Sequence, residues 1–128
     1  MMPLWKGRGY DRAVRREEVL KQASDIIAGK RLFLNPDLRF NDVVRAAGTN
    51  RTYLWDAVHS LGLGFRDYLA RFRVVYFIEH AWLEEYRSLS NDDIAERCGF
   101  SSKKLLDRYL QKIIGISFSR YMEIVRRS

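Results

Sequence analysis

The sequence has 128 residues, which suits one domain and leaves no room for a second of ordinary size. Hydrophobic residues make up 47% of the chain, enough for a buried core, and two prolines and eight glycines argue against a fibrous or disordered chain. Lys and Arg number 23 against 16 Asp and Glu, and the resulting net charge of +7 favours a polyanionic partner, either nucleic acid or an anionic membrane surface.

The chain opens on a basic segment, residues 1–16, in which no helical stripe is visible. Its cationic residues are Lys6, Arg8, Arg12, Arg15 and Arg16. Runs of charge are usually solvated, so we expect residues 1–16 to be a tail or a linker, with a phosphate-touching arm as the alternative.

Residues 17–128 are expected to form an all-α domain. Apolar residues at helical spacing predict a first helix from Val19 to about Gly29. A first helix-turn-helix is predicted at about residues 41–61, where Asn41 or Asp42 caps a short helix that Gly48 ends. Thr49 or Asn50 then caps the second helix of this unit, whose inward residues are Leu54, Ala57, Val58 and Leu61.

A longer helix at about residues 65–86 is apolar on two sides, so we expect it to link two subdomains. A second helix-turn-helix follows at about residues 91–114, with Gly99 between its helices and Ser101 or Ser102 as the cap of the later one. Leu106, Tyr109, Leu110 and Ile113 form the expected buried stripe of that later helix. A last helix is predicted over residues 117–126.

The two halves of the chain resemble each other. Residues 41–48 align with residues 92–99, and residues 62–69 align with residues 115–122, so that the offset drifts from 51 to 53 residues. The shared positions are mostly glycine, aromatic or apolar, which are the positions that the packing and the turn of a helix-turn-helix constrain. A duplicated unit in a basic chain is considerably stronger evidence for helix-turn-helix units than one pair of short helices is.

Two segments carry a family resemblance, residues 50–54 (Asn-Arg-Thr-Tyr-Leu) and residues 94–102, with Gly115 and Tyr121 beyond them. Over about residues 17–127 the sequence resembles the DNA-binding domain of the AraC/XylS family of bacterial transcription regulators. The resemblance implies a homeodomain-like fold of seven helices, in two helix-turn-helix subdomains joined by a long linker helix. It also implies double-stranded DNA as the partner, read by one helix of each unit in successive major grooves, with RNA polymerase recruited or blocked as a result.

Candidate base-contacting residues lie on the second helix of each unit. The resemblance places Thr52, Trp55, Asp56, Lys103, Lys104, Asp107 and Arg108 where the family reads bases. Helical spacing alone puts Arg51, Trp55 and His59 on one outward side, and Lys104, Arg108 and Lys112 in a basic stripe. Arg and Lys can pair with guanine, and Asp can accept from cytosine. The alternatives are that Trp55 packs against a neighbouring loop and that the stripe is a solvated helix face.

Candidate phosphate-contacting residues lie mainly at the helix starts, where hydroxyl or amide groups adjoin free backbone N–H donors. These residues are Thr49, Asn50, Ser101 and Ser102, with Lys112 and Arg66 in addition. A carboxylate near phosphates costs affinity unless it finds a donor, so Asp56 is expected either to weaken binding by the first unit or to leave that unit only an orienting role.

The main alternative function is a helical protein-interaction module in which specific DNA binding is weak or lost. We expect no enzyme and no cofactor, because the sequence has no Gly-rich phosphate loop and His59 and His80 have no ligand cluster at metal spacing. The single cysteine, Cys98, reads as a buried structural thiol in a cytoplasmic protein. No apolar run approaches the length of a membrane span, and an effector or dimerisation domain outside this sequence is left open.

Overall fold

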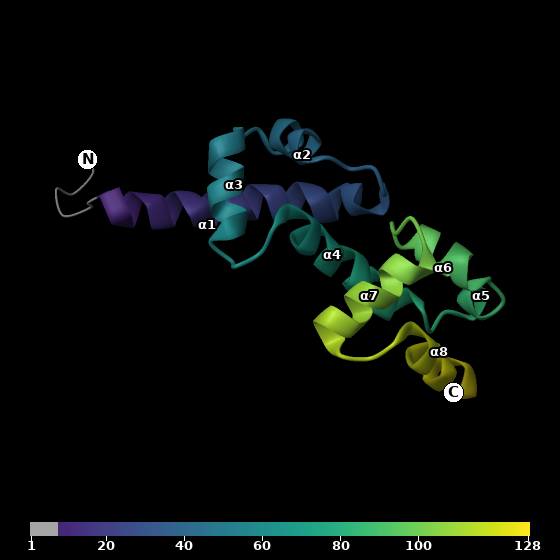
Figure 1. The fold of residues 1–128 in the computed structure, drawn as a ribbon. Coiled ribbons are helices and arrows are strands. Elements are labelled where there is room, and N and C mark those ends of the chain that lie inside the picture. The colour runs from purple at the N-terminus through teal and green to yellow at the C-terminus, as the bar shows by residue number, and fades with distance from the viewer. Residues whose placement is uncertain (1–7) are drawn as a thin grey trace. The chain divides into compact units, whose positions relative to one another are not determined.

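The computed structural model describes residues 8–128, and this part of the chain is built from helices without a strand (Figure 1). The elements are α1 (Arg8–Gly29), the 3₁₀ helix η1 (Leu32–Leu34), α2 (Phe40–Ala47), α3 (Arg51–His59), α4 (Phe65–His80), α5 (Glu84–Arg87), α6 (Asn91–Arg97), α7 (Lys103–Ile114) and α8 (Phe118–Arg127). The prediction of an all-α fold is therefore confirmed.

The described residues hold eight α-helices where seven were predicted, and the difference lies in residues 65–86. Instead of one long helix, α4 ends at His80 and α5 begins at Glu84. The chain leaves the α-helical pattern at Leu83, whose amide donates to the His80 carbonyl three residues back and whose backbone is extended. This turn limits the linker helix to 16 residues.

The chain divides into two compact units, and the boundary passes through α4. The first unit comprises Met1–Leu32 and Leu38–Tyr68, and the second comprises Phe33–Asp37 and Leu69–Ser128. The middle of the connection between α1 and α2, residues 33–37, therefore belongs to the second unit, although the helices on either side of it belong to the first.

In the first unit, α3 crosses α1, and α2 also packs on α1 (Figure 1). The core of this unit is aliphatic, with Ala23, Ile27, Val43, Leu54 and Val58 fully buried. Helix α1 begins at Arg8, so the expectation that residues 8–16 form a tail or linker is wrong; residues 1–7 lie outside the described residues. Polar contacts to α3, described below, hold this early part of α1.

The second unit surrounds a larger core that α4, α6, α7 and α8 share. Phe77, Phe100, Phe118 and Leu106 are among its fully buried side chains. Cys98 is also fully buried, and burial raises the pKa of its thiol to about 12, so the prediction of a structural thiol is confirmed. None of the helices in residues 8–128 has the length and apolar character that a membrane crossing requires.

Arg73 of α4 ties the connection between α1 and α2 into the second unit. Its guanidinium donates to the carbonyl oxygens of Phe33 and Asn35, at 2.7 and 2.9 Å, although the residue is buried. Burial lowers the pKa of Arg73, and the two carbonyls replace the water that the guanidinium has lost. A buried arginine thus fixes a segment that comes from the first half of the sequence.

Candidate nucleic-acid interface

Each unit contains a short helix, a tight turn and a second helix, as the repeat predicts. The turn after α2 has Gly48 at φ 68°, and the turn after α6 has Gly99 at φ 90°, in the region that glycine enters without strain. The second helices carry side-chain caps, because Asn50 accepts from the Tyr53 amide of α3 and Ser102 accepts from the Leu105 amide of α7. At the start of α2 the predicted cap is wrong: Arg39 is the N-cap, and Asp42 accepts from its amide.

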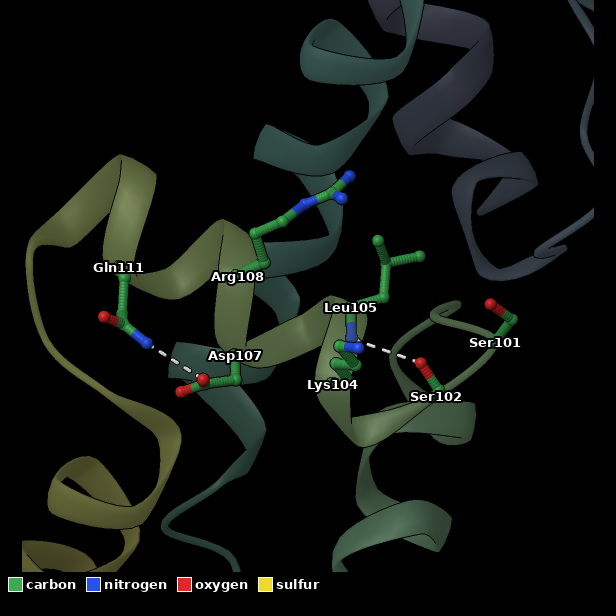
Figure 2. Close-up of a pocket in the computed structure, with 7 residues that line it drawn as sticks. All are labelled: Ser101, Ser102, Lys104, Leu105, Asp107, Arg108 and Gln111. Atoms are coloured by element: carbon green, nitrogen blue, oxygen red, sulfur yellow. Dashed lines mark hydrogen bonds between the residues drawn. The ribbon is translucent and has the colours of Figure 1, made fainter.

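The exposed side of α7 forms a surface hollow of about 470 Å³ (Figure 2). The hollow is lined by Ser101, Ser102, Lys104, Leu105, Asp107, Arg108 and Gln111. Ser101 and Ser102 lie at the start of the helix, and Lys104, Arg108 and Gln111 follow at intervals of four and three residues, which places them on one face. The side chains in the hollow are therefore mostly hydrogen-bond donors, and two of them are cationic.

The charge at the start of α7 suits an anion. Lys103 and Lys104 occupy its first turn, which holds no acidic residue. The first turn of a helix carries unpaired backbone N–H groups and the positive end of the helix dipole, so cations there are unfavourable unless an anion joins them. The Asp92 carboxylate meets part of this need, because it accepts from the Lys103 amide at 3.3 Å. The two lysine side chains still favour binding of phosphate or another anion at that end of the helix.

Two predicted base-contacting residues of α7 also serve the fold of the second unit. Asp107 is half-buried, and its two oxygens accept from the Phe118 amide of α8 at 2.8 Å and from the Gln111 side chain at 2.9 Å. The Lys103 ammonium lies 5.7 Å from the centre of the Phe118 ring. The structure therefore brings Lys104 and Arg108 together on the open face and gives Asp107 and Lys103 contacts to α8.

The exposed side of α3 carries fewer charged residues than that of α7 and more aromatic surface. Arg51, Thr52, Trp55 and His59 are exposed as spacing predicted, and Trp55 is 56% accessible. The Trp55 and His59 rings stack with their centres 3.9 Å apart. Leu61, predicted to be inward, is exposed because α3 ends at His59 and Leu61 belongs to the following turn.

Asp56 does not lie on the exposed face, so the prediction that it contacts a base is wrong. The residue is 6% exposed and is covered by arginines of α1. Arg16 donates to both of its oxygens, at 2.8 and 2.9 Å, and Arg12 donates at 2.5 and 3.3 Å. These donors hold the pKa of the Asp56 carboxyl far below its usual range, so it stays ionised. With its oxygens occupied, Asp56 has no acceptor to offer a base.

Counting from the N-caps aligns the two second helices. Four residues after Asn50 and Ser102 lie Leu54 and Leu106, and eight residues after them lie Val58 and Leu110, all fully buried. By the same count Thr52 corresponds to Lys104, Trp55 to Asp107, Asp56 to Arg108 and His59 to Gln111. The first unit thus places a covered carboxylate where the second unit places an exposed cation.

The predicted phosphate-contacting residues are accessible to different degrees. Asn50, Arg66, Ser101 and Lys112 are exposed, and Thr49 and Ser102 are half-buried. Asn50 and Ser102 each use a side-chain oxygen to cap a helix. What they can offer a phosphate is therefore the N–H groups of the Asn50 side chain and the O–H of Ser102. Gln111 was missed by the sequence analysis, and its position seven residues after Lys104 is the signal that could have found it.

Within residues 8–128, no group of three or more His, Cys, Asp or Glu side chains is arranged to hold a metal ion. The polar side chains that the structure does gather are the donors on α7 and the arginines around Asp56. Both groups are suited to an anionic ligand rather than to a cation.

Comparison with known proteins gives a likeness of fold. No family model matches the chain, and no curated protein matches it. Among solved structures, the chain is similar to the C-terminal domain of AraT, a response regulator from Geobacillus stearothermophilus, with a TM-score of 0.63 and 23% sequence identity. The match covers 84% of each chain. The chain therefore shares the all-helical fold of that regulator's C-terminal domain.

Proposed function

We propose that this chain binds double-stranded DNA through two helix-turn-helix units, with α3 and α7 as the helices that enter the major groove, and that it thereby regulates transcription. The single observation that carries the proposal is the open face of α7, where Lys104, Arg108 and Gln111 project beside an anion-favouring helix start. A helix of this width fits the major groove, and these side-chain types are those that read base edges there.

The residues have distinct proposed roles. Lys104 and Arg108 pair with guanine, and Gln111 pairs with adenine. Ser101 and Ser102 at the start of α7 contact the phosphate backbone, which fixes the register of the helix on the duplex. Asp107 acts as a positioning residue, because its hydrogen bonds orient Gln111 and hold the start of α8 against α7.

The fold supports this proposal because a response-regulator domain of 23% identity has it as well. An AraC-type architecture, a cytoplasmic location and an effect on RNA polymerase belong to the same proposal. It assigns the chain no catalytic role and no cofactor.

A protein-interaction module is the second candidate, and the surface of α3 favours it. Trp55 and Tyr53 are exposed there, and Arg51 is the only Lys or Arg on the helix. Aromatic residues are enriched in protein interfaces, whereas charged residues are depleted in their centres. On this reading, substitutions of Trp55 weaken a protein complex, and duplex DNA binds without sequence preference.

The test begins with selection of duplexes from a random pool by the purified chain, followed by gel shifts in rising salt. We expect a steep fall in affinity with salt and a preference for the selected sequences over scrambled ones. The variant Lys104→Ala/Arg108→Ala should lower affinity for the selected duplex at least about 30-fold and relax its sequence preference, since each base contact is worth about 1–3 kcal/mol.

The matched control is Arg126→Ala/Arg127→Ala, which removes the same charge from the exposed end of α8. It should leave sequence preference unchanged. If the wild-type chain selects no sequence from the pool, or if both double variants weaken binding equally, specific reading by α7 is wrong.

A further inference from the structure

Arginines of α1 gather beside α3 around a single carboxylate. Besides the Arg12 and Arg16 hydrogen bonds, Arg15 approaches Asp56 at 3.7 Å, and its guanidinium lies 4.2 Å from the centre of the Tyr53 ring. We call Arg12, Arg15 and Arg16 the arginine cluster. The cluster brings three cations to one anion, so two positive charges remain uncompensated within it.

The cluster faces outward on one side of α1. Positions i, i+3 and i+4 share a helix face, which groups the three arginines and places Glu17 on the opposite side of α1. By the same geometry Asp11 and Glu18 flank the cluster on the Arg15 side. The Arg12 and Arg15 side chains remain 56% and 37% accessible although both contact Asp56. The cluster therefore presents positive charge to solvent at the edge of α3.

The place of the cluster on α3 corresponds to the place of a cation on α7. Asp56 occupies the position of Arg108, as the count from the N-caps shows. Thr52, which is exposed, lies one turn before Asp56 on the same side of α3, as Lys104 lies one turn before Arg108 on α7. In the first unit the positive charge at this edge comes from α1, and Asp56 is the anchor that holds it there.

From these observations we infer that Arg12 and Arg15 contact DNA phosphates and that Asp56 and Arg16 position them beside α3. The inference rests on the proposed function and adds a phosphate-binding surface from α1 to it. Guanidinium groups bind phosphate oxygens through paired N–H donors, and a duplex whose major groove holds α3 presents its backbone at the edges of that helix. Arg16, whose two hydrogen bonds to Asp56 are both short, keeps the anchor paired when Arg12 and Arg15 turn to the ligand.

The test compares two double variants in gel shifts with the duplex selected by the wild-type chain, over a range of salt concentrations. Arg12→Gln/Arg15→Gln removes both charges but keeps N–H donors for Asp56, and Arg12→Lys/Arg15→Lys keeps the charges. Log affinity falls with log salt, and each phosphate contact adds about 0.9 to the steepness of that fall. The Gln pair should therefore make the slope shallower by about 1.8. Affinity at 0.1 M salt should then fall roughly 60-fold, equally for selected and scrambled duplexes. The Lys pair should retain most of the slope.

The matched control, Lys21→Gln/Lys30→Gln, removes the same net charge from two exposed positions, one in the second half of α1 and one directly after its end. It should leave the slope close to that of the wild type. A Gln pair with the wild-type slope, or a Lys pair that loses as much slope as the Gln pair, would overturn the inference. Either result leaves the proposed function standing if Lys104→Ala/Arg108→Ala still relaxes sequence preference, whereas a wild-type chain that binds no duplex overturns both.

Discussion

Helices α3 and α7 bury the same positions and expose different chemistry. Leu54 and Val58 in the first unit match Leu106 and Leu110 in the second, so each helix packs on its own core in the same register. On the open side, α7 carries its own cations, whereas α3 carries Arg51 and the arginine cluster beside it belongs to α1. The comparison teaches that a repeated unit can keep its packing and still take the charge of its surface from a neighbouring helix.

The sharpest difference between the units lies in their turns, and glycine substitutions test it. Gly48 and Gly99 end the first helix of each unit at positive φ, but a Cβ added at Gly48 meets open space. At Gly99 it would lie 2.4 Å from the Phe33 carbonyl oxygen and 3.0 Å from Arg73 Nε. Gly48→Ala should therefore cost about 1–2 kcal/mol through backbone strain alone, and Gly99→Ala about 3 kcal/mol or more because overlap adds to the strain.

Urea unfolding of both variants measures these costs. Equal losses at the two glycines would contradict the account, because they would mean that the connection between α1 and α2 does not press against the second turn. The predicted difference also tests the Arg73 contacts, which hold that connection in place.

The two aspartates offer a second contrast, since Asp56 anchors α1 and Asp107 accepts from the start of α8. Asp56→Asn removes the charge that Arg16 and Arg12 share, and leaves their guanidiniums without a counterion. We expect the melting temperature at pH 7 to fall by roughly 5 °C or more. Asp107→Asn retains a carbonyl oxygen for the Phe118 amide, so a fall of about 2 °C or less is expected.

The Asp56 effect should depend on pH in a defined direction. The folded chain holds the pKa of Asp56 below its usual value, chiefly through the Arg16 hydrogen bonds and next through those of Arg12. The stability gained is therefore fully present above the ordinary Asp pKa of about 3.9 and is lost as the pH falls below it. The difference in melting temperature between the wild type and Asp56→Asn should shrink below about pH 4. A difference that does not decrease at all as the pH falls below about 4 would show that ionised Asp56 is not its source.

The two units also differ in how far sequence alone could predict them. The buried and exposed sides of α7 follow from local periodicity, because Leu106, Leu110, Lys104 and Arg108 all lie within one helix. The burial of Asp56 depends on residues 40 and 44 positions away, in a stretch of α1 that shows no apolar stripe. The spacing of Arg12, Arg15 and Arg16 indicates a helix face, but nothing local indicates the carboxylate that they bind.

Helix ends were predicted least well where the N-cap is not a typical capping residue or where the apolar pattern continues past the end of the helix. The Ser102 cap of α7 was one of two serines foreseen from their hydroxyls. The start of α2 at Phe40 was not foreseen, because its N-cap is an arginine and the capping carboxylate of Asp42 lies inside the helix. The end of α4 was missed because Ala81, Trp82 and Leu83 continue the apolar pattern through the turn.

The smallest effect we predict concerns Trp55 and Trp82, the exposed tryptophans among residues 8–128. Trp82 donates from its indole nitrogen to the Tyr121 hydroxyl at 3.0 Å, whereas the ring contact described for Trp55 is the stack on His59 of the same helix. Trp82→Ala should cost about 1–2 kcal/mol of unfolding free energy, and Trp55→Ala at most about 0.5 kcal/mol.

Urea unfolding paired with gel shifts decides what Trp55 is for. If it belongs to the DNA-facing side of α3, Trp55→Ala lowers affinity for the selected duplex and leaves unfolding nearly unchanged, while Trp82→Ala does the reverse. A loss of stability at Trp55 equal to that at Trp82 would instead show that the exposed ring is packing for the first unit. In that case the open face of α3 would retain only Arg51, Thr52 and His59 for DNA, and specific reading would depend on α7.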